Sequence, residues 1–145
     1  MDDLNTERIE SLKAGICGAL SLSLAFSVMT LLHLFLAKQF PTVAIWQTPT
    51  TINLLFSGGV AFLSGFLFGI TYRYIIRQDD NSHLQEGAVL SFGLVRGLAQ
   101  VDIGLKWENT LWSLGILCIE SLLLFAFARF ALDLAIYRQW VKPAR

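Results

Sequence analysis

The sequence predicts an all-α fold, an integral membrane bundle of four transmembrane helices in a single domain over residues 1–145. Hydrophobic residues make up 54% of the chain and charged residues 15%, and the mean hydropathy is +0.58. That balance is too apolar for an ordinary soluble domain. Apolar segments long enough to cross a bilayer recur along the chain, with short polar turns between them. Basic residues gather on one side of the topology that these segments define.

The expected helices cover residues 14–37, 52–73, 83–101 and 110–133. A helix needs about 20 residues to cross the hydrocarbon core of a bilayer. The first two segments satisfy that length with apolar stretches that contain no charge, and the fourth satisfies it with Glu120 in its interior. We therefore expect these three segments to span the membrane.

The third segment needs a separate argument, because its apolar part is short and contains Arg96. Ser82 and Gln85 have the S-x-x-Q spacing of a capping box, which predicts a helix that starts near His83. With this polar first turn included, the helix is long enough to reach across the bilayer. The sequence thus predicts a fourth span.

The distribution of basic residues predicts that both termini are cytoplasmic. With the N-terminus inside, seven basic residues lie in cytoplasmic segments and two in outer loops, which is the bias expected of a membrane protein. The seven are Arg8, Lys13, Arg73, Arg77, Arg138, Lys142 and Arg145, and the two are Lys38 and Lys106.

Two pairs of glycines recur at four-residue steps, Gly65 with Gly69 and Gly93 with Gly97. Such steps leave a smooth strip on a helix where a second backbone can approach closely. The pattern predicts helix packing within one molecule, which we favour over a face for dimerisation because such steps are common in membrane helices.

Two charges are expected near the middle of the bilayer, Arg96 on the third helix and Glu120 on the fourth. Each lies nine residues inside its apolar segment, and the two helices run antiparallel. An isolated charge at this depth costs at least about 2.5–3.5 kcal/mol, so we expect the two opposite charges to pair with each other. The sequence predicts an Arg96–Glu120 ion pair. Supporting polar groups would come from Gln100, Asp102, Ser113 and Ser121.

Three interpretations of this pair stay open. The pair can be structural and fix the register of two helices. Glu120 can instead be a proton or cation site of a small transporter, since intramembrane charges are functional hypotheses by default. It can also ligate the magnesium of chlorophyll, with Arg96 neutralising the carboxylate. His33, near the outer end of the first helix, is expected to be a hydrogen-bonded interface residue.

The run R-Y-I-I-R-Q-D-D-N-x-x-L-x-x-G, followed by F-G-L-V-R-G-L-A-Q-V-D, resembles a small membrane-protein family of cyanobacteria and chloroplasts that is functionally uncharacterised. The resemblance covers residues 72–102, about a fifth of the chain. It implies a thylakoid or other cyanobacterial membrane, or else the plasma membrane, and brings no activity or ligand. The light-harvesting helix motif is absent, so pigment binding depends on the charge pair alone. The matching residues are Arg73, Tyr74, Arg77, Asn81, Leu84, Gly87, Phe92, Gly93, Leu94, Val95, Arg96, Gly97, Gln100 and Asp102.

No nucleophile elbow, phosphate loop or H-E-x-x-H pattern occurs, so we expect no enzymatic activity, no catalytic residue and no metal. No basic patch indicates nucleic acid. The expected partners are the lipid bilayer and another membrane protein or complex. The leading hypothesis is a non-enzymatic accessory or assembly factor of a larger, photosynthetic membrane complex, without a cofactor of its own. The rivals are the transporter or channel that uses Glu120 and the pigment-binding protein.

Overall fold

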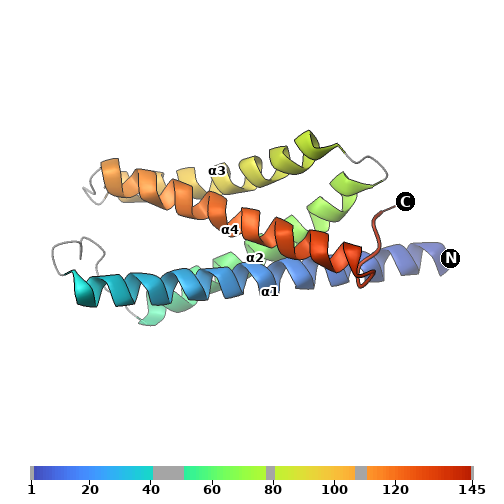
Figure 1. Cartoon of the computed structure of the whole chain (residues 1–145), viewed down its shortest axis with the longest axis horizontal. Coiled ribbons are helices and arrows are strands. Elements are labelled where there is room, and N and C mark those ends of the chain that lie inside the picture. The colour runs from blue at the N-terminus through green and yellow to red at the C-terminus, as the bar shows by residue number, and fades with distance from the viewer. Residues whose placement is uncertain (1, 41–50, 78–80, 107–110, 145) are drawn as a thin grey trace.

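The fold is described from a computed structural model that covers residues 2–40, 51–77, 81–106 and 111–144. These residues form four helices and no strand: α1 (Asp2–Gln39), α2 (Thr51–Ile76), α3 (Ser82–Lys106) and α4 (Leu111–Tyr137). The all-α prediction is confirmed. Figure 1 shows the helices as a long bundle in which the start of α1 and the tail after α4 lie at the same end.

Three of the four helices are long and apolar enough to cross a membrane: Asp3–Gln39, Thr51–Ile76 and Leu114–Tyr137. α3 is not among these candidate spans. Its 25 residues are long enough, but Arg96 and the polar first turn lower its hydropathy. Composition therefore identifies three spans in the described chain, and α3 as a fourth span stays a prediction.

The helices are longer than the sequence predicted, most of all at the start. α1 begins at Asp2 and not near residue 14, which adds about three helical turns ahead of the apolar stretch. Those turns hold Glu7, Arg8, Glu10 and Lys13, which are good helix formers. The apolar stretch marks the part that fits a bilayer core and not the ends of the helix.

The start of α3 is capped by a different residue from the predicted one. The backbone N–H of His83 donates to Asn81 Oδ1 at 3.1 Å, and the N–H of Leu84 donates to the Asn81 carbonyl at 3.1 Å. Asn81 is therefore the N-cap, and the predicted capping box of Ser82 and Gln85 is wrong. Asparagine caps a helix as well as serine does, so the S-x-x-Q spacing alone could not decide whether Asn81 or Ser82 is the N-cap.

Glycines bring α1 and α2 into backbone contact. A Cβ on Gly65 would lie 2.5 Å from the Gly18 carbonyl oxygen, and a Cβ on Gly69 would meet the Ala14 carbonyl and lie 3.1 Å from Gly15 Cα. Because the obstacles are backbone atoms, only glycine fits at this crossing. The predicted step of Gly65 and Gly69 thus packs inside the molecule, against α1.

The second glycine pair brings α3 against α4. A Cβ on Gly93 would lie 3.0 Å from Leu122 Cα, and a Cβ on Gly97 would lie 2.9 Å from Cys118 Cα. Leu122 and Cys118 are also four residues apart, so two matching strips face each other. The bundle is therefore two antiparallel hairpins, α1–α2 and α3–α4, which Figure 1 shows crossing each other.

Aromatic rings fill the space between the hairpins. Phe68 of α2, Phe92 of α3 and Phe125 of α4 lie with ring centroids 5.2–5.7 Å apart, and Tyr72 stacks on Phe68 at 5.4 Å. Leu124 and the rings of Phe68, Tyr72 and Phe125 are buried. This aromatic cluster is the core of the bundle and occupies its interior between the two ends.

The chain turns back after α4. The N–H of Trp140 donates to the Ala135 carbonyl and that of Gln139 to the Ile136 carbonyl, both at 2.9 Å, which is the Schellman pattern. Gln139 takes the left-handed position with φ of 58°, where glycine is usual. The turn carries Val141 and Ala144 into buried contacts at the end of the bundle where α1 begins.

Candidate functional site

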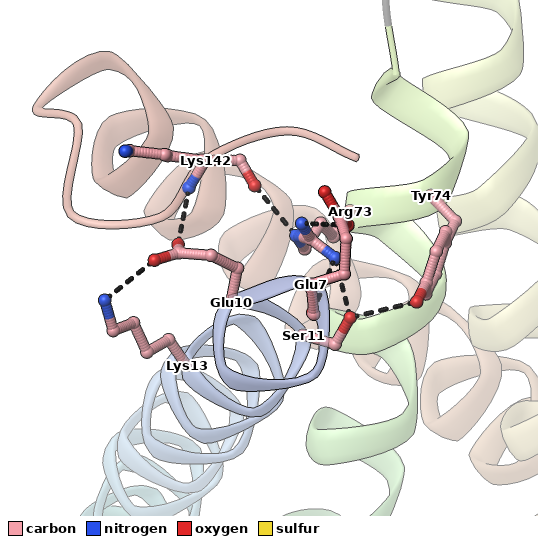
Figure 2. A network of polar contacts seen from close by, with 7 residues as sticks. All are labelled: Glu7, Glu10, Ser11, Lys13, Arg73, Tyr74 and Lys142. Carbon is pink, nitrogen blue, oxygen red and sulfur yellow. Dashed lines mark hydrogen bonds and ion pairs between the residues drawn. The ribbon is translucent and has the colours of Figure 1, made fainter. Parts of the chain in front are cut away.

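The most buried charged side chain of the described chain is Arg73 of α2, with 1% of its surface exposed. Its Nη2 lies 2.7 Å from Glu7 Oε2, and its Nη1 donates to Ser11 Oγ at 2.7 Å and to the Glu7 carbonyl at 3.3 Å. Its Nε donates to the Lys142 carbonyl at 2.8 Å. The guanidinium therefore joins α1, α2 and the tail after α4, as Figure 2 shows.

A second carboxylate of α1 holds the same tail. Glu10 Oε2 accepts from the Lys142 backbone N–H at 2.9 Å, and Glu10 Oε1 forms an ion pair with Lys13 Nζ at 2.8 Å. Ser11 Oγ donates to Tyr74 Oη at 3.1 Å. We call these seven residues the Arg73 cluster: Glu7, Glu10, Ser11, Lys13, Arg73, Tyr74 and Lys142 (Figure 2).

Sequence reasoning does not predict the Arg73 cluster, because it counts Arg73 among the basic residues of a cytoplasmic segment. An arginine at the end of an apolar helix normally extends its charge to water. The signal that could have indicated otherwise is the i, i+4 spacing of Glu7 and Ser11 on a helix that continues to Asp2. The cluster satisfies the donors of a buried charge and fixes three chain segments. It is a structural site.

Polar side chains also join α2, α3 and α4 near this end. Tyr72 Oη donates to Asp133 Oδ1 at 2.6 Å, while Arg129 lies 3.6 Å from Asp133 Oδ2 and donates to Gln85 Oε1 at 2.9 Å. An open groove of about 540 Å³ lies beside them between α3 and α4. Glu86 shares its polar rim, and Val89, Leu90 and Phe130 form its apolar wall.

The intramembrane charges lie toward the opposite end of the bundle. His33 is six residues before the end of α1, Glu120 nine after the start of α4 and Arg96 ten before the end of α3. At 1.5 Å per residue these positions are about 9, 14 and 15 Å from that end. Helical side chains lean toward the N-terminus of their helix, so His33 leans inward and Glu120 leans outward. The two can meet for this reason.

The structure places Glu120 against His33. His33 Nε2 lies 3.5 Å from Glu120 Oε2, and the two side chains are 30% and 14% exposed. Glu120 Oε2 is buried and accepts no hydrogen bond from the residues that the structure describes. On α3, the Nε and Nη1 atoms of Arg96 are also buried without a hydrogen-bond partner. We call His33, Arg96 and Glu120 the His33–Glu120 site.

The predicted ion pair of Arg96 with Glu120 is therefore not formed. No ion pair or hydrogen bond joins these two residues in the described structure, although both are in the predicted helices and partly buried. The reason lies in α1, which packs on α4 and presents His33 to the carboxylate. Sequence reasoning considered only α3 and α4 as the source of a partner for each charge. It did not consider a side chain from α1.

Of the other predicted polar residues, those whose side chains the structure describes form no hydrogen bond with Glu120. Gln100 is half-buried and Asp102 is exposed on α3, and no hydrogen bond joins either to Glu120 among the described residues. Ser121 is buried with its Oγ unpartnered. The side chain of Ser113 lies outside the described residues. Glu120 Oε2 thus faces His33 without accepting a hydrogen bond from any described residue.

Searches against protein-family models, curated proteins and solved structures find no match to this chain. The resemblance of residues 72–102 to the family of cyanobacteria and chloroplasts therefore stays a prediction, and the functional argument rests on the residues themselves.

Proposed function

We propose that this chain is a small integral membrane protein of four transmembrane helices that acts as a non-enzymatic accessory or assembly factor of a larger membrane complex. We propose further that this is a photosynthetic complex of a thylakoid or other cyanobacterial membrane, which the resemblance of residues 72–102 supports. The observation that best supports this proposal is the position of α3. This helix is the least suited to lipid by composition, yet it packs chiefly on α4, less on α2, and makes no contact with α1 among the described residues.

The outer face of α3 is open along its whole apolar part. Leu90, Leu94, Val95 and Leu98 are 42–70% exposed. A membrane helix that carries a buried arginine gains from a protein neighbour, because lipid cannot offer hydrogen bonds to the charge. The two predicted glycine steps are used inside the molecule, so they do not form the docking face. A partner helix on the open face of α3 fits this arrangement.

Co-purification from native membranes tests the proposal. We expect a tagged chain in mild detergent to retain subunits of a larger complex, and Val95→Trp on α3 to lose most of them by altering the docking face. The matched control is Leu63→Trp on α2, whose side chain is 61% exposed and should retain the partners. A monomer without partners, or equal loss in both variants, would contradict docking through α3. An absorption spectrum of the eluate reports bound pigment.

A proton-coupled transporter or channel is the second candidate, and one observation favours it. Glu120 is a partly buried carboxylate whose Oε2 lies 3.5 Å from a histidine nitrogen and has no hydrogen-bond partner among the described residues. In this alternative, liposomes that contain the chain would carry a proton-coupled flux. Glu120→Gln should abolish the flux, whereas Glu86→Gln, an exposed carboxylate at the start of α3, should leave it unchanged. Equal flux in both variants would exclude Glu120 as the coupling group.

A further inference from the structure

The side chains of His33 and Glu120 can together bind one exchangeable proton. An imidazole nitrogen and a carboxylate oxygen face each other at 3.5 Å, close enough for a small movement to bring them into hydrogen-bond contact. A proton from water can reside on Nε2, which gives an imidazolium beside a carboxylate, or on Oε2, which gives a carboxylic acid beside an imidazole. Both forms place the proton between α1 and α4.

The charges around this pair disfavour a metal ion as the occupant. Arg96 from α3 contributes a permanent positive charge, which a metal cation would have to approach in a medium of low dielectric constant. The described residues also contain no group of three or more His, Cys, Asp and Glu side chains that could hold a metal. The other ionisable groups toward this end of the described helices include Cys118, two residues before Glu120 on α4, Lys38 on α1 and Asp102 on α3. Before Tyr72, α2 contributes none.

Along the described helices, the pair lies nearer one end of the bundle than the other. His33 is 30% exposed and lies nearest the end where α1 stops and α4 begins. In the other direction, the next ionisable groups are Arg129 and Asp133 of α4, Glu86 of α3 and Tyr72 of α2, and Tyr72 donates to Asp133. Between them and Glu120 lies the aromatic cluster of Phe68, Phe92 and Phe125, whose rings offer no proton-relay groups.

We propose that His33 and Glu120 form a proton-binding site within the bundle, that this site exchanges its proton with water at the end where α1 stops and α4 begins, and that the aromatic cluster closes it toward the Arg73 cluster. Such a site binds and releases a proton without conducting it across the membrane. It would let protonation at one membrane surface alter the contact between α1 and α4. The inference does not depend on the accessory-factor proposal.

Nuclear magnetic resonance of the whole chain in lipid nanodiscs can test the proton site. The chain has two histidines, so His83→Gln leaves His33 as the single imidazole. We expect the ¹⁵N signals of His33 to titrate, and Glu120→Gln to move the midpoint by about one pH unit or more, as loss of a charge within about 4–6 Å does. Glu86→Gln is the control and should leave the midpoint unchanged. A His33 that does not titrate, or a midpoint that Glu120→Gln leaves in place, would overturn the site.

Sealed vesicles that contain the protein in one known orientation test the one-sided access. The His33 signal should follow a pH jump on the side where α1 stops, and should not respond to a jump on the other side. Proton leakage should equal that of protein-free vesicles. A response to both sides, or a leak that Glu120→Gln removes, would overturn the closed side and favour the transporter.

Discussion

Replacing Arg73 with glutamine should lower the free energy of unfolding by about 3 kcal/mol, because breaking a buried ion pair leaves its partner uncompensated. The guanidinium of Arg73 is 1% exposed and is bonded to Glu7, Ser11 and the Lys142 carbonyl. A glutamine at this position is too short to reach all three. The loss would release the tail, the start of α1 and the end of α2 together.

Thermal unfolding in detergent micelles, followed with a thiol-reactive dye, measures this effect. Cys17 of α1 and Cys118 of α4 are free thiols that are partly buried, so they become reactive when the bundle opens. The matched control is Arg8→Gln, since Arg8 is an exposed arginine on α1. Arg73→Lys should unfold between the two, because it keeps the charge and loses the planar donor geometry. Arg73→Gln that unfolds together with Arg8→Gln would show that the cluster adds no stability.

The Arg73 cluster also gives the tail a structural role that its composition conceals. Residues 138–144 contain two basic residues, Arg138 and Lys142, which the positive-inside rule explains as topology signals. In the structure, the main chain of Lys142 accepts from Arg73 and donates to Glu10. Backbone groups form these contacts, so the side chain at position 142 has little influence on them. This is why a sequence pattern cannot reveal them.

The helices and their approximate positions followed from hydropathy, because a membrane span must be both apolar and long. Their ends did not, because a helix continues as long as its backbone and polar side chains find partners, as α1 does back to Asp2. Gly65 and Gly93 were recognisable as packing positions from spacing alone. Which helix each one contacts depends on which helices pair into a hairpin, and a local spacing does not encode that pairing.

The intramembrane site was predictable only in part. A charge within an apolar helix must be explained, and this rule identified Arg96 and Glu120. It left His33 as a hydrogen-bonded interface residue, because a histidine near a helix end carries no comparable penalty. The structure instead shows a carboxylate that contacts α1 and an arginine whose Nε and Nη1 atoms are unpartnered. Sequence reasoning paired Arg96 with Glu120 because they lie at the same depth in one hairpin. It did not consider α1, which packs on α4 at that depth.

Replacing Gly18 of α1 with valine should separate α1 from α2 and cost about 3 kcal/mol, the upper part of the range for overpacking, since backbone cannot move aside as a side chain can. A Cβ at Gly18 would meet the Gly65 carbonyl and lie 2.9 Å from Gly69 Cα. Gly59→Val on α2 is the matched control, because nothing lies within 4 Å of a Cβ there. In the thiol-reactivity assay, Gly18→Val should expose Cys17 at a much lower temperature than the control. Equal unfolding temperatures would mean that α1 and α2 do not cross at Gly18, and the hairpin arrangement would have to be rejected.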